Sequence, residues 1–233
     1  MPRPCDPYDR VVPVRAVFFD VGETLVDETE VWGRWADWLG VPRLTLFAAL
    51  GARVIRKEDH RGLFEMVCPG RNIDALVRAR EASGEGGGFT LDDLYPDARP
   101  CLEAVAALGY RVGIAGNQPQ QSQGVLEQSG LPYEWLVISD VAGVAKPSPG
   151  FFAHLCELSG LPPEEIAYVG DRPDYDVAPA AAAGMVAIHL RRGPWGVIHA
   201  DSPLLERAHL RLESLAELPG RLERLGSGRG LGD

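Results

Sequence analysis

Residues 14–25 read VRAVFFDVGETL, and this stretch decides the fold. Its first half is a nearly continuous apolar run, which is typical of a strand that is covered on both faces of a parallel sheet. Asp20 follows the run directly. In open α/β sheets, ligands bind at the carboxyl ends of the strands. The stretch therefore predicts a buried strand that delivers a carboxylate to a binding crevice.

Four further apolar runs follow along the chain, at residues 112–115, 136–138, 166–169 and 185–190. Helical patterns over residues 98–108, 149–159 and 177–183 separate the later runs, and each ends at a glycine. This alternation predicts an α/β fold with a doubly wound, parallel, Rossmann-like sheet. Residues 208–211 are a weak candidate for an edge strand, and a helix is expected over residues 215–225.

Residues 27–90 contain no strand pattern and are expected to form an inserted all-α helical cap domain. Asp27 with Glu30 resembles a capping box, and apolar residues follow at helical spacing up to Gly40. Further helices are expected after Pro42, around residues 63–67 and after Asn72. The predicted domains are therefore a core of residues 1–26 and 91–225, the cap, and a disordered tail at 226–233. Residues 84–88 are expected to be a flexible linker.

The chain has 23 Lys and Arg against 33 Asp and Glu, a net charge of −10. An acidic protein of this kind repels phosphate backbones and anionic lipid, so we expect neither nucleic acid nor membrane as a partner. No export signal is apparent in the sequence. The four cysteines are scattered without metal-ligand spacing, which favours reduced thiols in a cytoplasmic protein.

Polar residues follow several of the predicted strands. Asp20, Asn117, Asp140 and Asp171 each stand where an apolar run finishes, and although one such residue is usually a turn or cap, the ordered set indicates a site. Lys146 is one of only two lysines in a chain with 21 arginines. A compact ammonium group is therefore expected to be required there.

Four segments, taken in order, resemble the motifs of the haloacid dehalogenase-like hydrolase superfamily. They are DVGETL (20–25), GIAGN (113–117), VAKPSP (144–149) and VGDRPDYD (169–176). The resemblance covers about residues 14 to 200 and includes a helical cap after the first motif. It implies that Asp20 is a nucleophile that forms an aspartyl-phosphate. It also implies that Mg²⁺ is held by Asp20, Asp171 and the backbone carbonyl of Gly22, while Lys146 neutralises Asp20 and the phosphoryl oxygens.

The resemblance also gives roles to smaller residues. The residues expected on the substrate side are Thr24, Gly116 and Asn117. Thr24 would fix the first loop through its hydroxyl, Gly116 would offer a backbone N–H, and Asn117 would donate to substrate or orient Asp20. Asp176 either hydrogen-bonds Lys146 or a metal-bound water, or caps the Ala-rich helix. Asp174 is expected to be a turn residue.

Two positions depart from the family's pattern. The superfamily's phosphatases carry a second Asp two residues after the nucleophile, as acid and base, and Gly22 stands there. Glu23 is displaced by one residue and is expected to point elsewhere. Gly116 stands where the family usually has Ser or Thr. Hydrolysis of alkyl phosphates is therefore expected to be weak, with good leaving groups favoured, and Gly22→Asp is expected to raise the alkyl rate about 10-fold or more.

The sequence favours a phosphatase for a small phosphorylated metabolite and leaves three alternatives open. One is a phospho-ligand binding protein with negligible turnover. Another is a 2-haloacid dehalogenase, although the family's dehalogenases carry a Tyr at position 22. The third is carbon–phosphorus cleavage through Lys57, whose charged surroundings indicate a solvated side chain. The Trp32 and Trp35 stripe is expected to be the cap's own core, and the loop with Arg192 and Trp195 is expected to be exposed.

Overall fold

The computed structural model describes residues 14–84 and 88–226, and its centre is a six-stranded sheet in the order β3-β2-β1-β4-β5-β6. All five pairs of neighbouring strands are parallel. The strands are β1 Ala16–Phe19, β2 Arg111–Gly116, β3 Trp135–Ile138, β4 Ile166–Gly170, β5 Val186–Leu190 and β6 Leu210–Leu212. This confirms the doubly wound sheet, with β6 beginning two residues later than expected.

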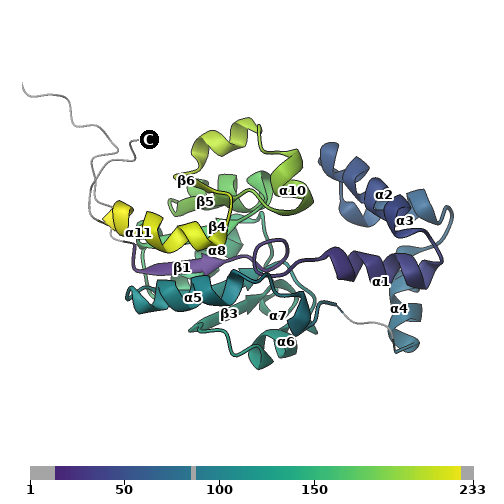
Figure 1. Cartoon of the computed structure of the whole chain (residues 1–233), viewed down its shortest axis with the longest axis horizontal. Helices are drawn as coiled ribbons and strands as arrows, with labels where there is room; N and C mark the ends of the chain where they lie inside the picture. The colour runs from purple at the N-terminus through teal and green to yellow at the C-terminus, as the bar shows by residue number, and fades with distance from the viewer. Residues whose placement is uncertain (1–13, 85–87, 227–233) are drawn as a thin grey trace, which may run out of the picture.

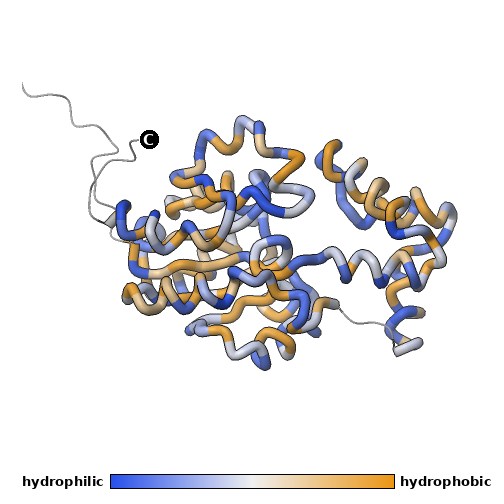
Figure 2. The backbone as a smooth tube through the Cα atoms, viewed as in Figure 1, coloured by the Kyte–Doolittle hydropathy of each residue, from blue (hydrophilic) through white to orange (hydrophobic). Residues whose placement is uncertain are grey.

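Side chains of β1 alternate between two apolar cores because successive residues of a strand point to opposite faces. Val17 and Phe19 pack into one core, and Ala16 and Phe18 into the other. Figure 1 shows helices in front of the sheet and behind it, and Figure 2 shows the apolar colour along β1. The first face is covered by α5 Ala98–Ala107, α6 Ser122–Gln128 and α11 Leu218–Gly226, and the second by α8 Pro149–Ser159 and α9 Ala178–Ala182.

The position of β1 between β2 and β4 determines where the site can form. The chain leaves β1 into Asp20, β2 into Asn117 and β4 into Asp171, all at the same edge of the sheet.

The remaining short helices lie in the connections between strands and helices. They are α7 Ser139–Ala142, α10 Gly193–Ile198, the π-helical turn η4 Pro173–Val177, and the 3₁₀ turns η1 His60–Gly62, η2 Leu91–Asp93, η3 Pro163–Glu165, η5 Pro203–Arg207 and η6 Leu215–Glu217.

Four helices form a separate layer beside this edge of the sheet (Figure 1). They are α1 Thr29–Leu39, α2 Arg43–Ile55, α3 Leu63–Val67 and α4 Ile73–Ala82. Their buried core includes Leu46, Leu50, Leu63 and Phe64, and Trp195 of α10 packs into it from the sheet side. The fold class predicted from the sequence, a parallel sheet with an all-α insertion, agrees with this arrangement.

The local signals at the ends of these helices are partly confirmed. Gly40 adopts a left-handed conformation after α1, and Asn72 caps α4 by accepting a hydrogen bond from the N–H of Ala75 (2.9 Å). The capping box predicted from Asp27 and Glu30 is wrong. Glu28 precedes α1 without a side-chain cap, and Asp27 Oδ1 accepts instead from the N–H of Thr29 (2.8 Å).

Several expectations fall at the ends of the described ranges. Most of the predicted linker (85–87) and most of the predicted tail (227–233) lie outside the described residues, whereas residue 226 still belongs to α11. Cys68, Cys101 and Cys156 are free thiols, and Cys5 lies outside the described part. Among the described helices none is by itself long and apolar enough to cross a membrane. Only α1 and α2 taken together, which are bent by 119° at their junction, reach the required length and composition.

Candidate active site

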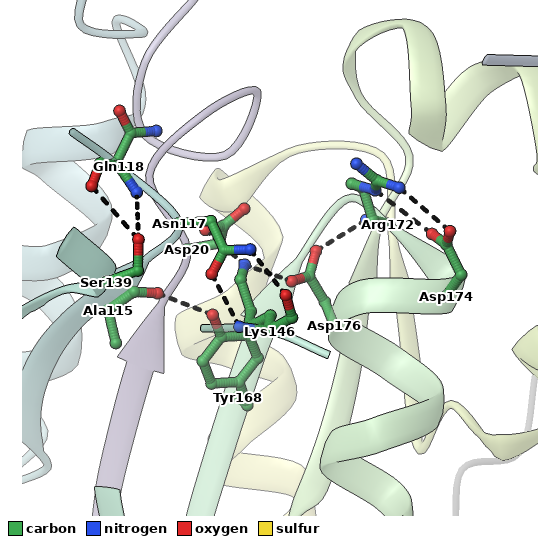
Figure 3. Close-up of polar contacts among 10 residues, drawn as sticks. All are labelled: Asp20, Ala115, Asn117, Gln118, Ser139, Lys146, Tyr168, Arg172, Asp174 and Asp176. Atoms are coloured by element: carbon green, nitrogen blue, oxygen red, sulfur yellow. Dashed lines mark hydrogen bonds and ion pairs between the residues drawn. The ribbon is translucent and has the colours of Figure 1, made fainter. Parts of the chain in front are cut away.

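Three carboxylates and one ammonium group meet at the carboxyl ends of β1 and β4, and Figure 3 shows Asp20, Asp176 and Lys146 among them. One carboxylate oxygen from each of Asp20, Asp171 and Asp176 lies within 4.8 Å of the others. Lys146 Nζ lies 2.6 Å from Asp20 Oδ1 and 2.5 Å from Asp176 Oδ1. All four residues are buried. The structure therefore brings the chemically important residues of the first, third and fourth sequence motifs into one cluster.

Asn117 holds Lys146 in this cluster. Its amide Nδ2 donates to the Lys146 carbonyl and its Oδ1 accepts from the Lys146 N–H, both at 2.8 Å. The sequence analysis expected Asn117 to donate to substrate or to orient Asp20. In the structure its amide positions the lysine backbone, and the lysine side chain in turn contacts Asp20 (Figure 3).

Asp176 hydrogen-bonds Lys146, one of the two alternatives that the sequence left open. Its second oxygen, Oδ2, accepts from the backbone N–H of Arg172 at 2.8 Å. The helix that it was expected to cap, α9, follows Val177 and has no side-chain cap. Asp174 pairs with the Arg172 side chain at 3.1 Å across the turn, in agreement with a turn residue.

The charges of the cluster are strongly coupled. Burial raises the pKa of Asp20 to about 6, against the lowering effect of Lys146 and with a further rise from Asp176. Burial lowers the pKa of Lys146, but the Asp176 and Asp20 carboxylates outweigh it and hold that pKa well above its usual value. Lys146 is therefore a permanent cation between two carboxylates.

Asp171 has the features of a ligand to a cation. Burial, followed by the Asp176 and Asp20 carboxylates, raises its pKa well above the usual range. Its Oδ2 atom is buried and has no hydrogen-bond partner among the described residues. A buried, unpartnered carboxylate oxygen beside a second carboxylate is a suitable donor set for a hard divalent cation. Asp20 and Asp171 could hold such an ion between them.

Two residues predicted on the substrate side have other surroundings. Thr24 is fully buried, does not line the cavity described below, and its hydroxyl has no hydrogen-bond partner among the described residues. The expectation that its hydroxyl fixes the loop is therefore wrong, and its backbone carbonyl accepts from Arg192 (3.0 Å) instead. Gly116 packs against Asp20, because a Cβ there would lie 2.7 Å from Asp20 Oδ1. A Ser or Thr at position 116, which the motif usually carries, would therefore require the Asp20 side chain to shift.

The space next to Gly22 is filled by Glu28, which the sequence analysis did not identify. A Cβ on Gly22 would lie 2.5 Å from Glu28 Oε1 and 3.0 Å from its Cδ. The chain returns to this point because Val21 O accepts from the N–H groups of Leu25 and Val26, both at 2.9 Å. Burial, then the Glu23 carboxyl, raises the pKa of Glu28 to about 8. The carboxyl group of Glu28 thus occupies the space next to position 22, where the sequence analysis expected no acidic side chain.

Glu23 supports this arrangement. Its Oε1 accepts from the N–H of Glu28 (3.1 Å), and its Oε2 accepts from the hydroxyl of Tyr95 (2.8 Å). Glu23 has a φ of 54°, in the left-handed region, whereas Gly22 does not. Burial raises the pKa of Glu23 to about 7 against the effect of these hydrogen bonds. Both of its oxygens are engaged away from Asp20, as the sequence analysis expected.

A cavity of about 490 Å³ opens onto the cluster and is lined both by residues of the α1–α4 segment and by loops that follow the strands of the sheet. Trp32 and His60 contribute from the α1–α4 side, where their rings meet edge to face with centroids 5.6 Å apart. Trp32 therefore borders the cavity, whereas Trp35 packs on Phe64 in the helical core, so the stripe serves both purposes. Lys57 is exposed, as expected, but also lines the cavity.

The loop after β5, expected to be exposed, is only partly so, because its residues run from exposed at Arg191 to buried at Trp195. Arg192 forms an ion pair with Asp97, and Trp195 is only 6 % exposed and lines the cavity. Arg172 also lines the cavity, with its guanidinium 3.7 Å from the Tyr175 ring centre. The cavity therefore joins the acidic cluster to a rim of aromatic and charged groups of both signs.

Comparisons with known proteins agree with this architecture. The model of the haloacid dehalogenase-like hydrolase family matches residues 14–184. The glyceraldehyde 3-phosphate phosphatase of Methanopyrus kandleri is 29 % identical over 202 residues, which are 78 % of this chain and 86 % of that protein. The phosphoglycolate phosphatase of Aliivibrio fischeri is 29 % identical, covering 77 % and 85 % of the two chains. A solved hydrolase of the same superfamily from Geobacter sulfurreducens superposes with a TM-score of 0.66 at 20 % identity, covering 90 % of this chain and 97 % of that one.

Proposed function

Because the chain belongs to the haloacid dehalogenase-like hydrolase family, we propose that it is a Mg²⁺-dependent phosphatase that acts on a small phosphorylated metabolite. The observation that carries the proposal is the contact of Lys146 Nζ with Asp20 Oδ1 at 2.6 Å, beside the unpartnered oxygen of Asp171. A carboxylate can attack a phosphate dianion only where cations offset their repulsion. This cluster supplies one cation and the ligands for another.

In the proposed reaction, Asp20 is the nucleophile. With a pKa of about 6, its carboxylate is ionised at neutral pH. An oxygen of Asp20 forms a bond to phosphorus as the bond from phosphorus to the leaving oxygen breaks, which gives an aspartyl-phosphate that water then hydrolyses. Lys146 neutralises charge on Asp20 and on the phosphoryl oxygens. Mg²⁺, held by Asp20 and Asp171, would supply electrostatic stabilisation of the transferring phosphoryl group.

The cavity and the relatives support a small substrate. A cavity of about 490 Å³ is within the range of small-molecule sites. The names of the two relatives, glyceraldehyde 3-phosphate phosphatase and phosphoglycolate phosphatase, give small phosphorylated compounds as their substrates. Arg172 and Lys57 at the cavity add positive charge that suits an anionic substrate.

The test is phosphate release from a panel of aryl, acyl and alkyl phosphates, with Mg²⁺ and with a chelator. Asp20→Asn should abolish release, because an amide cannot form the covalent intermediate, while the fold is kept by the nearly isosteric change. Asp140→Asn is the matched control, since Asp140 also follows a strand but is exposed and outside the cavity.

Two results would contradict the proposal, and each would favour a different function. Binding of inorganic phosphate without turnover of any ester would favour a phospho-ligand binding protein. Chelator-resistant release of halide from a 2-haloacid, lost in Asp20→Asn, would favour a dehalogenase.

A further inference from the structure

The carboxyl group of Glu28 lies beside the backbone of Gly22, two residues beyond Asp20 in the chain. Glu28 Oε1 lies 2.5 Å from the position that a Cβ of residue 22 would occupy. Glu28 and Asp20 line the same cavity. A proton donor to a leaving group has to open onto the same cavity as the nucleophile. The place of Glu28, beside position 22 and on the cavity that Asp20 also lines, suits such a donor.

The other carboxyl groups around Asp20 are engaged elsewhere. Both oxygens of Asp176 accept hydrogen bonds, from Lys146 and from the Arg172 N–H. Both oxygens of Glu23 also accept, from Tyr95 and from the N–H of Glu28. Asp171 lies within the anionic cluster that would hold a cation. Glu58 and Asp59, also at the cavity, are exposed. Glu28 differs from these groups in that its carboxyl reaches the space next to position 22.

The position of Glu28 is held from three sides. Glu23 fixes its backbone N–H, and Trp32 Nε1 donates to Glu28 Oε2 at 3.3 Å. The Gln118 side chain lies next to the carboxyl, with Nε2 3.5 Å from the position of a Cβ on residue 22. These contacts leave Oε1 as the oxygen that faces position 22. A carboxyl held in this way is pre-positioned for the reaction, which is a requirement for efficient proton transfer.

We propose that Glu28 is the general acid and base of this site, an inference that rests on the phosphatase function proposed above. In the first step, the Asp20 oxygen bonds to phosphorus, the electron pair of the broken bond stays on the leaving oxygen, and that oxygen takes the proton of Glu28. In the second step, the Glu28 carboxylate accepts a proton from water as the water oxygen bonds to phosphorus. The bond from Asp20 to phosphorus breaks, and the carboxylate of Asp20 and the acid form of Glu28 return.

The test uses two esters whose leaving groups differ in their need for a proton. Ethyl phosphate loses a strongly basic alkoxide, whereas 4-nitrophenyl phosphate loses a stable phenolate. For Glu28→Gln we expect turnover of ethyl phosphate to fall about 10²-fold or more. With 4-nitrophenyl phosphate, the variant should release the first equivalent of phenolate at the wild-type rate and then turn over slowly, because the base for the second step is missing. Glu30→Gln, the same change at an exposed position in the first turn of α1, just after Glu28, should behave as wild type.

A second pair of variants separates a catalytic role from a structural one. Glu28→Ala removes the carboxyl and opens the space next to position 22. The double variant Gly22→Asp/Glu28→Ala puts a carboxyl back into that space from a different backbone position. We expect it to regain at least about 10-fold of the ethyl phosphate turnover lost in Glu28→Ala. A purely structural contribution of Glu28 would not be restored in this way.

The outcomes distinguish this inference from the function on which it rests. Two results would overturn the role of Glu28 and leave the phosphatase function standing. One is an equal loss of first-turnover rate on both esters, without recovery in the double variant. The other is an unchanged rate of Glu28→Gln on ethyl phosphate. If wild type hydrolyses neither ester while Glu28→Gln and wild type bind phosphate equally, the phosphatase function itself fails, and the role of Glu28 with it.

Discussion

Replacing Lys146 by Met should destabilise the protein far more than the loss of a surface lysine does. The change keeps most of the side chain's volume and removes a buried ammonium group that lies 2.6 Å from Asp20 and 2.5 Å from Asp176. Breaking a buried ion pair by removing one partner costs about 3–5 kcal/mol, because the remaining charge is left uncompensated. At about 2–4 °C per kcal/mol for a chain of this size, the melting temperature should fall by roughly 6–20 °C.

The pH dependence of this loss checks its electrostatic cause. Burial already raises the pKa of Asp20 to about 6, and removal of Lys146 takes away the interaction that lowers it. A carboxyl whose pKa is raised by folding favours the folded state when protonated, and it loses that contribution as pH rises through the folded-state value. The difference between variant and wild type should therefore shrink when the pH is lowered from 8 to 5.

Thermal unfolding of Lys146→Met without added metal, followed at several pH values, is the measurement. Lys57→Met is the matched control, because Lys57 is the only other lysine and is exposed. The double variant Lys146→Met/Asp176→Asn should recover part of the loss, since it removes one uncompensated carboxylate. Equal melting temperatures of Lys146→Met and Lys57→Met across the pH range would refute the description of this cluster.

Three further predictions concern the same cluster. Gly22→Asp alone should lower alkyl phosphate hydrolysis, contrary to the rise expected from the sequence, because its Cβ would lie 2.5 Å from Glu28 Oε1. The rates of wild type and variant on ethyl phosphate check this, and a rise of about 10-fold or more would contradict it. Gly116→Ala should reduce turnover and leave the fold intact, because the new methyl group would lie 2.7 Å from Asp20 Oδ1. Steady-state kinetics measure the turnover and circular dichroism checks the fold; turnover equal to that of wild type would show that Asp20 tolerates the displacement. Mg²⁺ should raise the melting temperature of wild type and not of Asp171→Asn, since that residue carries the unpartnered oxygen; an equal rise in both would place the ion elsewhere.

The strands and the parallel, doubly wound arrangement could be predicted from the sequence, because a strand that is buried on both faces is a nearly continuous run of apolar residues. Once the strands are parallel and adjacent, topology alone brings Asp20 and Asp171 to one edge. The two readings of Asp176 could not be separated, since an aspartate that caps a helix and one that binds a lysine look the same in sequence. Its partner Lys146 is 30 residues away along the chain.

Glu28 illustrates what a sequence pattern cannot provide. Its place next to Gly22 depends on the tight turn that Val21 closes with Leu25 and Val26, and no spacing rule predicts that return. The sequence showed only an acidic residue before a helix. The half-buried ion pair of Arg192 and Asp97 could not be predicted either, because its members are 95 residues apart and each alone resembles a solvated charge.

The packing of α10 against the α1–α4 helices has a consequence for how the chain unfolds. Trp195 is part of the apolar core of those helices, and His199 Nε2 donates to the carbonyl of Val54 at 2.8 Å. Arg34 of α1 donates to the carbonyl of Gly88 and pairs with Asp93. Melting of the sheet would therefore remove part of the core of the helices and leave their apolar surface in water. The two parts are expected to denature together, in one calorimetric transition whose van't Hoff enthalpy equals its calorimetric enthalpy.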